Sequence, residues 1–246
     1  MLLSGFAHVV QKPVYEIPPR LFQPSAEAAL LIPTERIRAC PDCGLFFHHC
    51  SLHPDAICHH RSVVFTAGAC SNNGQRGASG GYGVAVGVGK DQQRSHPFCY
   101  AIPKTNQRAE LMGAVEGIDE GVDWWRRERA HQRESGVRGH EGKEVIVATD
   151  SEYVVKGVTE WLPQWKENEM KTSNGTAPVN IDLFLQIESR IQRMDGLTVV
   201  IRFMHIPREK NGLADMLAKQ AAELDSQGIW NTEGVAVHGM PAFTEF

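Results

Sequence analysis

The chain has 246 residues, with 25 Lys and Arg against 29 Asp and Glu, which gives a formal net charge of −4 and a pI near 6.3. A hydrophobic content of 42% is enough for a real core and excludes wholesale disorder. The mild acidity argues against a protein that coats nucleic acid by bulk charge, but it leaves room for a local basic groove. No run of about 18 apolar residues is present, so we expect no membrane-spanning helix.

The first 60 residues lack the regular pattern of the rest. Residues 1–35 contain five prolines and no clean periodicity, which is typical of a loosely ordered arm. Residues 36–60 are dense in Cys and His. Four cysteines, Cys40, Cys43, Cys50 and Cys58, are candidate zinc ligands, because the first two have the spacing of half a zinc knuckle. Other candidate ligands are the histidines His48, His49, His53, His59 and His60. The alternative is a set of reduced thiols beside the first strand.

The N-terminus bears on the compartment. Residues 1–12 lack a charged start and a long apolar run, so we read no secretory signal. We therefore expect an intracellular protein with reduced thiols, nuclear or cytoplasmic, and leave a mitochondrial address open. We also expect a monomer.

From Arg61 the pattern of strands and helices becomes regular. The sequence predicts three antiparallel strands at 62–70, 82–90 and 96–102, with a turn at 71–81. A helix is predicted from Gln107 to about Arg129, because apolar residues recur there at steps of three and four.

The second half predicts strands that alternate with helices. Residues 145–149 are continuously apolar, as in a strand buried on both faces. The remaining expected elements are a helix at 151–166 interrupted near Pro163, a helix at 180–193, a strand at 197–206 and a helix at 210–224. Together they predict an α/β domain over 61–225: a five-stranded mixed sheet, three antiparallel strands and then parallel ones, flanked by helices. Residues 226–246 form a tail.

Three acids are expected at one edge of this sheet. Asp150 ends the strand 145–149, Glu110 lies near the start of its helix, and Asp215 lies early in the last helix. Taken singly, Asp150 could be a helix N-cap and Glu110 a carboxylate favoured by the helix dipole, whereas an unpaired Asp215 beside an apolar face would be costly. Taken together, carboxylates without Cys or His suit Mg²⁺ or Mn²⁺. Two such ions about 4 Å apart clamp both oxygens of a phosphodiester displacement.

Five segments carry a family resemblance, in the order VVFTAGACSNNG, GGYGV, TNQRAELMGAVEGI, VIVATDSEYVVKGVTEWLPQWKENEMKTSNG and HIPREKNGLADMLA. Over residues 62–224 the chain resembles ribonuclease H of type 1. The resemblance implies a ribonuclease H-like fold and an endonuclease that hydrolyses the RNA strand of RNA/DNA hybrids. It also implies two Mg²⁺ ions, with Mn²⁺ as a substitute, held by four carboxylates. Three of these match Glu110, Asp150 and Asp215, which become the expected catalytic and metal-binding residues.

The fourth carboxylate is missing. The family's first strand ends in Asp-Gly, and this chain has Ala67-Gly68. Because the missing acid is the one expected to touch both metals, we expect impaired cleavage, whether position 67 was changed by hand or in nature. The alternatives are a non-catalytic protein that binds RNA/DNA hybrids or RNA, and an interaction protein that uses the fold as a scaffold.

The resemblance also implies substrate contacts by Asn72, Asn73, Thr105, Asn106, Gln107, Trp161, Gln164 and Trp165. Each has a plainer reading: a turn at Asn72-Asn73-Gly74, capping by Thr105 or Asn106, and packing for the tryptophans. The segment 164–171 resembles the family's substrate handle but balances two lysines with two glutamates, so we expect modest affinity. His205 ends the last strand, and we expect a packed histidine there rather than the mobile catalytic-loop histidine of many members.

Overall fold

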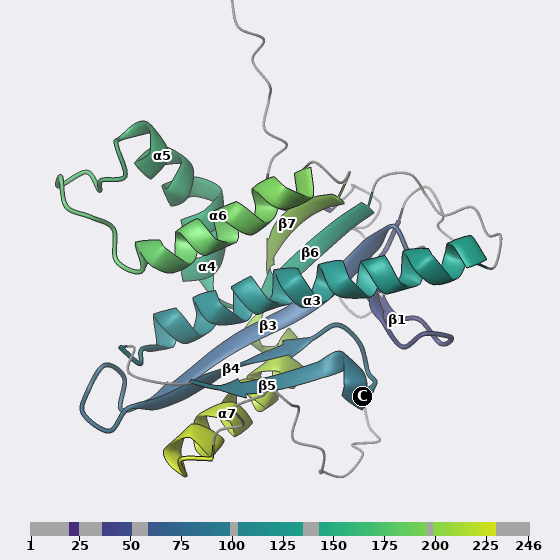
Figure 1. Cartoon of the computed structure of the whole chain (residues 1–246), viewed down its shortest axis with the longest axis horizontal. Coiled ribbons are helices and arrows are strands. Elements are labelled where there is room, and N and C mark those ends of the chain that lie inside the picture. Colours follow the sequence, from purple (N-terminus) through teal and green to yellow (C-terminus); the bar gives the residue numbers. More distant parts are fainter. Residues whose placement is uncertain are drawn as a thin grey trace, which may run out of the picture.

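The computed structural model describes residues 20–24, 36–50, 59–98, 103–134, 143–195 and 199–229. In these ranges a mixed sheet of seven strands forms the centre (Figure 1). The strands are β1 (Ile37–Ala39), β2 (Phe46–His48), β3 (Arg61–Ser71), β4 (Ser79–Ala85), β5 (Gln93–Pro97), β6 (Lys143–Thr149) and β7 (Val199–His205). β3 is central: it pairs antiparallel with β4 and parallel with β6, while β5 and β7 lie outside these. The predicted α/β class is confirmed.

The two strands beyond the expected five come from the Cys/His-rich segment. β1 and β2 form an antiparallel hairpin, and Phe47 of β2 pairs with Ser62 of β3. The backbone N–H of Phe46 also donates to the carbonyl of Val86, 2.9 Å away. Leu45 and Phe47 are buried in the same core as β3 and β6, so this hairpin packs on the sheet rather than on a core of its own.

The second strand begins three residues earlier than the sequence predicts. Its start, Ser79-Gly-Gly, reads as a turn, yet a Cβ at Gly81 or Gly83 would collide with the helix packed on that face. The glycines are therefore strand residues that permit close packing. β5 likewise begins and ends earlier than the expected strand 96–102.

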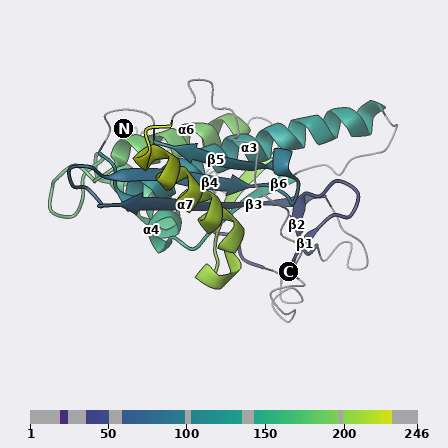
Figure 2. The same ribbon diagram turned by 90° about the horizontal axis from the view of Figure 1, so that it is seen from below.

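Helices cover both faces of the sheet (Figure 2). α3 (Asn106–Glu134) and α6 (Ile181–Asp195) lie on one face, and α7 (Gly212–Ser226) covers the other. α4 (Glu152–Lys156) follows β6 and contacts α3. Short 3₁₀ turns, η1 (Lys90–Gln92) and η3 (Arg208–Lys210), precede β5 and α7. No helix among the described residues is long and apolar enough to cross a bilayer.

The helix expected to break near Pro163 does not break there. α4 continues through the π-helical turn η2 (Gly157–Trp161) into α5 (Leu162–Glu167), and Pro163 lies in the first turn of α5. The irregularity thus precedes the proline, which has no N–H for the helical ladder.

The predicted arm and tail lie mostly outside the described residues. Of the arm, Leu21 bridges to Phe203 of β7, and the N–H of Phe22 donates to the Phe203 carbonyl over 2.8 Å. Of the tail, residues 226–229 are described: Ser226 is the last residue of α7, and 227–229 follow it.

Candidate active site

Glu110 is held against the centre of β3. The backbone N–H of Gly68 donates to its Oε2 over 3.0 Å. A Cβ at position 68 would collide with the backbone of Ala109 and Glu110, so only glycine lets α3 lie this close to the strand. The close approach explains why a carboxylate on a helix reaches the middle of the sheet.

Position 67 faces α7, on the opposite side of the sheet from α3. Because strand residues alternate between faces, the side chain of Ala67 points away from α3. It is 2% exposed and packs against Ala214 and Ala218 of α7, beside Asp215. The alanine that replaces the expected acid is therefore part of a close contact between β3 and α7.

Asp150 directly follows β6, and it does not cap the next helix. Ser151 is the N-cap of α4, and its hydroxyl accepts from the N–H of Val154. Asp150 instead accepts a hydrogen bond at Oδ1 from the side-chain amide of Asn211, 2.6 Å away. The plain capping interpretation of Asp150 is wrong.

Asn211 is a site residue that the sequence did not reveal. It is 1% exposed, and its amide nitrogen also donates to the Thr66 carbonyl over 2.9 Å. The one amide thus joins β3, the end of β6 and the start of α7. Its partners lie far away in sequence, so no local pattern could have pointed to it.

Asp215 lies in the first turn of α7 and is paired with cations. Lys219 Nζ lies 2.6 Å from one carboxylate oxygen, and Arg208 approaches the other at 3.4 Å. The Asp215 side chain is 21% exposed, so these cations are in contact with solvent around it. The cost of a carboxylate beside an apolar face is met by this pairing.

The three acids influence one another. Burial and the charge of Asp150 raise the pKa of Glu110 to about 8, and the charge of Asp215 adds to the rise. The hydrogen bond from the Gly68 N–H and the positive charge of Arg208 lower this pKa in part. Glu110 is thus within electrostatic reach of both other acids. Their oxygens are nevertheless not gathered into a tight cluster, because among the described residues only Cys40, Cys43 and His59 place three ligand atoms within 4.8 Å of one another.

The expected groove-contacting amides meet at the start of α3. Asn73 Oδ1 accepts from the N–H of Asn106, 2.9 Å away, and Thr105 Oγ1 accepts from the N–H of Arg108 at 3.2 Å. Asn72 has a positive φ of 50°, so it also forms the turn that the plainer interpretation expected. Asn106 and Gln107 are exposed. The structure brings these residues together on one surface.

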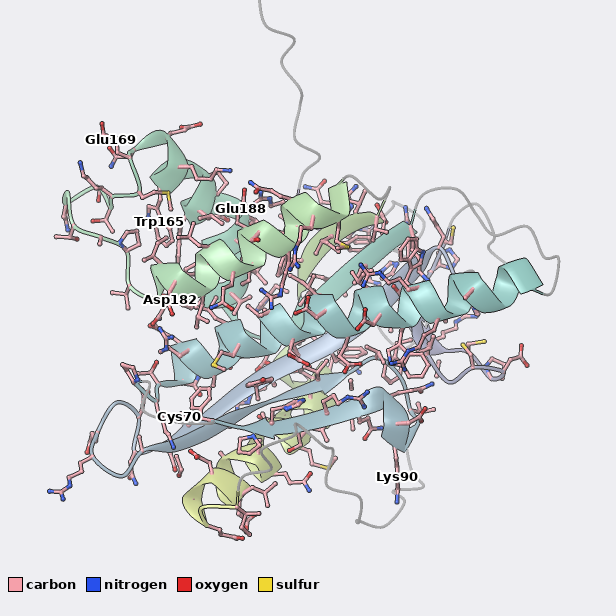
Figure 3. All side chains as sticks on the ribbon, viewed as in Figure 1. Cys70, Lys90, Trp165, Glu169, Asp182 and Glu188 are labelled. Carbon is pink, nitrogen blue, oxygen red and sulfur yellow. The ribbon has the colours of Figure 1, made fainter. Side chains whose placement is uncertain are left out.

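The handle, residues 157–171, carries two partly exposed tryptophans with different partners. Trp165 packs edge-on against Phe184 of α6, with ring centroids 5.3 Å apart, whereas Trp161 contacts Tyr153 and Trp165. Figure 3 shows Trp165 between the handle and α6, and Glu169 at the outer end. Gln164 is exposed. The packing interpretation holds for Trp165, and Trp161 remains available to a ligand.

Lysines of the handle are already paired within the chain. Lys166 contacts Glu188 of α6 at 2.7 Å, and Lys171 contacts Glu169 at 2.8 Å. This pairing is consistent with a handle that contributes little electrostatic affinity.

Two expectations outside the acid site need correction. The side chain of His205 is exposed at the end of β7, so the packed position expected for it is wrong. Of the candidate zinc ligands, Cys40 and Cys43 lie together with His59, whereas Cys50 is buried but is not in that group. Cys58 and His53 lie outside the described residues.

A central strand between two helices, with acids from α3, β6 and α7 around it, defines a ribonuclease H-like α/β domain. Residues 59–223 match the family model described as RNase H, and the chain belongs to this family.

Relatives with a curated description agree with this assignment. Ribonuclease H1 of Homo sapiens is 32% identical over 169 residues, which cover 65% of this chain and 50% of the human protein. Ribonuclease H of Pseudomonas entomophila is 31% identical over 160 residues, covering 65% of this chain and 92% of the bacterial protein. The match thus spans about half the length of the mammalian relatives and most of the bacterial one.

Solved structures with a similar fold are more distant. RNase H1 from the halophilic archaeon Halobacterium salinarum is 19% identical, with a TM-score of 0.41, over 66% of this chain and 98% of that one. LC11-RNase H1, solved in complex with an RNA/DNA hybrid, is 22% identical, with a TM-score of 0.39, over 65% and 96%.

Proposed function

We propose that this chain is a metal-dependent ribonuclease directed at the RNA strand of RNA/DNA hybrids, and that Ala67 impairs its cleavage step. Membership of the RNase H family supports the substrate and the reaction class. The observation that carries the proposed impairment is the place of position 67. Its neighbour Thr66 is bound by the amide that holds Asp150, its neighbour Gly68 holds Glu110, and its own side chain faces Ala214, next to Asp215.

The remaining donors suit a hard divalent cation. Glu110, Asp150 and Asp215 offer oxygen atoms only, which is the preference of Mg²⁺ and Mn²⁺. Burial and two other acids raise the pKa of Glu110 to about 8. A bound cation would offset the repulsion among these acids and stabilise the ionised form of Glu110. These three residues would hold the ions, two as in the family resemblance, and the ions would supply charge for the attack of water on phosphorus.

Two features should weaken the metal site. The missing fourth carboxylate removes one negative donor, and Asp215 is paired with Lys219 and Arg208, which a cation must displace. We therefore expect low metal affinity, with weak or absent cleavage, in the chain as it stands.

Seating of the hybrid would use the surface at the start of α3. Asn72, Asn73, Asn106 and Gln107 present short amides that fit the wide, shallow minor groove of an A-like duplex. Thr105 lies at the N-terminal end of α3, where the helix dipole attracts a phosphate. On the handle, Trp161 and Gln164 would contact the DNA strand.

A second candidate is a non-catalytic protein that binds hybrids. One observation favours it: Ala67 is 2% exposed and fits its surroundings against Ala214 and Ala218, as a residue adapted to its place does. Such a protein would keep the surface around Asn106 and Thr105 without turning over.

The deciding experiment restores the acid. The parent, Ala67→Asp and the uncharged control Ala67→Asn are compared for cleavage of a labelled hybrid with Mg²⁺ and with Mn²⁺, and for binding by fluorescence anisotropy. We expect Ala67→Asp to cleave faster than the parent by about two orders of magnitude or more, the size expected for a main electrostatic group of a site, and Ala67→Asn to behave like the parent. Robust, equal activity in all three would refute the role of position 67. Equal binding without cleavage in all three would favour the non-catalytic candidate.

A further inference from the structure

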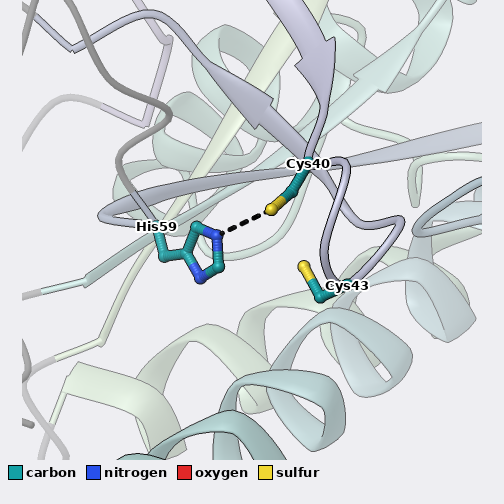
Figure 4. Close-up of side chains that lie close together, drawn as sticks. All are labelled: Cys40, Cys43 and His59. Carbon is teal, nitrogen blue, oxygen red and sulfur yellow. Dashed lines mark hydrogen bonds between the residues drawn. The ribbon is translucent and has the colours of Figure 1, made fainter.

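A second cluster of metal-binding side chains lies at the other end of β3. Cys40, Cys43 and His59 place two sulfur atoms and one imidazole nitrogen within 4.8 Å of one another (Figure 4). His59 Nε2 lies 3.4 Å from Cys40 Sγ. From Arg61 to Ala67 the strand runs six residues, about 20 Å, so this cluster is separate from the acids. None of its three residues belongs to the proposed nuclease site.

The backbone around Cys40 is folded as a metal-binding knuckle. The turn after β1 closes through the N–H of Gly44, which donates to the Cys40 carbonyl over 2.8 Å, and Gly44 has the positive φ of 74° that this turn needs. Hydrogen bonds reach the Cys40 sulfur from the backbone of Cys43 and Asp42 and from the side chain of His59. Donors directed at a sulfur atom stabilise the thiolate, the form that binds metals.

The rest of the fold holds the ligands in place. Gln92 of η1 donates to the Cys43 carbonyl over 2.7 Å, and the N–H of Val88 donates to the Gly44 carbonyl over 3.0 Å. The ring of His59 stacks on Phe47, with centroids 4.1 Å apart and planes 4° from parallel. Neither the knuckle nor the imidazole is therefore free to drift, and the site is formed before any ion arrives.

The distances suit a small tetrahedral ion. With Zn–S near 2.3 Å and Zn–N near 2.0 Å, a sulfur and a nitrogen on one zinc lie about 3.6 Å apart. The 3.4 Å between His59 Nε2 and Cys40 Sγ is close to that value. Two thiolates with one imidazole are typical zinc donors, and hard Mg²⁺ does not favour them.

We propose that Cys40, Cys43 and His59 bind one Zn²⁺ ion, with a fourth position left for a water molecule or another donor. The ion would fasten the β1–β2 hairpin to the residues that lead into β3. Its role would be structural, because it lies far from the acids and its ligands are held by the core.

Metal content of the full-length chain tests the proposal. We expect about one zinc per chain in protein purified under reducing conditions and analysed by mass spectrometry of its metals, because the three ligands form a single site. Cys43→Ser and His59→Asn should lose most of it. Cys70→Ser is the matched control, because Cys70 is a partly buried thiol on β3 outside the cluster, and it should keep the zinc.

A second measurement covers variants that fold poorly. Titration of the metal-free parent with Co²⁺ should give the absorption bands of a tetrahedral ion with thiolate ligands, and Zn²⁺ should abolish them. EDTA should lower the melting temperature of the parent but not that of Cys43→Ser. Absence of zinc and of the Co²⁺ bands in the reduced parent would overturn the proposal, as would a Cys40–Cys43 disulfide in that sample or full zinc retention by Cys43→Ser. None of these outcomes depends on whether the chain cleaves a hybrid.

Discussion

The amide nitrogen of Asn211 donates to Oδ1 of Asp150 over 2.6 Å and to the Thr66 carbonyl over 2.9 Å. Both partners are acceptors, so the amide can face them only with its N–H₂ group. A buried side chain thereby fixes the position of an acid that lies on another element.

We expect Asn211→Ala to lower the free energy of unfolding by about 2 kcal/mol, because a buried carbonyl and a carboxylate both lose their donor. Asn211→Asp should cost more at pH 7 than at pH 4, since it sets a second carboxylate against Asp150. Urea denaturation at both pH values checks this, with Gln107→Ala as a control on an exposed amide. Unchanged midpoints for both Asn211 variants would contradict the role assigned to this bond.

The pKa of Glu110, raised to about 8 from 4.5, makes stability depend on pH. Between these two pH values the folded state keeps the proton on Glu110, whereas the unfolded chain has released it. The stability that the protonated Glu110 contributes is therefore complete below pH 4.5 and is lost as the pH rises through about 8. In EDTA, Glu110→Gln should therefore unfold at higher denaturant than the parent at pH 8.5. The difference should fall to little at pH 5. Because the residue is only partly buried, we expect a gain of about 1–2 kcal/mol at pH 8.5. A constant difference across this range would show that Glu110 titrates normally.

Asp225 anchors the far end of α7. Its side chain is fully buried, accepts from the N–H of Gly80 at 2.8 Å and pairs with Lys104 at 2.6 Å. Asp225→Ala should destabilise the chain by about 3 kcal/mol, because it strands a buried N–H and a partly buried ammonium. Lys171→Ala, which breaks the exposed pair with Glu169, should change the unfolding midpoint very little. Equal effects of the two substitutions would argue against the anchoring role.

The two tryptophans of the handle should separate binding from stability. Trp165→Ala removes a ring packed on Phe184 and should cost about 2 kcal/mol of folding free energy. Trp161→Ala also removes ring contacts, with Tyr153 and Trp165, and should cost less stability than Trp165→Ala but weaken hybrid binding several-fold, since its partly exposed ring can contact a sugar. Thermal unfolding and fluorescence anisotropy on both variants measure the split. If Trp161→Ala binds a hybrid as the parent does, the handle has no such contact.

Much of the fold follows from the sequence, because buried strands are recognisable by their apolar residues. β6 contains a continuous apolar run and β7 is largely apolar, and α3 has apolar residues at helical spacing, of which Leu111, Ile118 and Val122 are buried. β4 was displaced in the prediction because its glycines look like a turn until α7 is placed against them. β1 and β2 were missed because the cysteines and histidines around them suggested a metal site, whereas Phe47 joins the core.

The candidate site was only partly predictable. Glu110, Asp150 and Asp215 stand in recognisable motifs, so residue type and order were enough to propose them as candidates. Asn211 acts on partners 61 and 145 residues away, and such a contact exists only once the sheet is formed. Spacing also could not say whether Cys50 or His59 joins Cys40 and Cys43, because that depends on where the chain enters β3.

Three glycines, Gly113, Gly117 and Gly121, lie along the side of α3 that faces the sheet. An added methyl group would collide with Thr66 at Gly117 and with Val64 and Val145 at Gly121, and would be tight against the Ala67 carbonyl at Gly113. The distance between the sheet and α3, the helix that contains Glu110, is thus set by glycines, which have no functional side chain. A single alanine among these glycines would push α3, and Glu110 with it, away from the sheet. The variant would then behave like one in which an acid itself had been replaced.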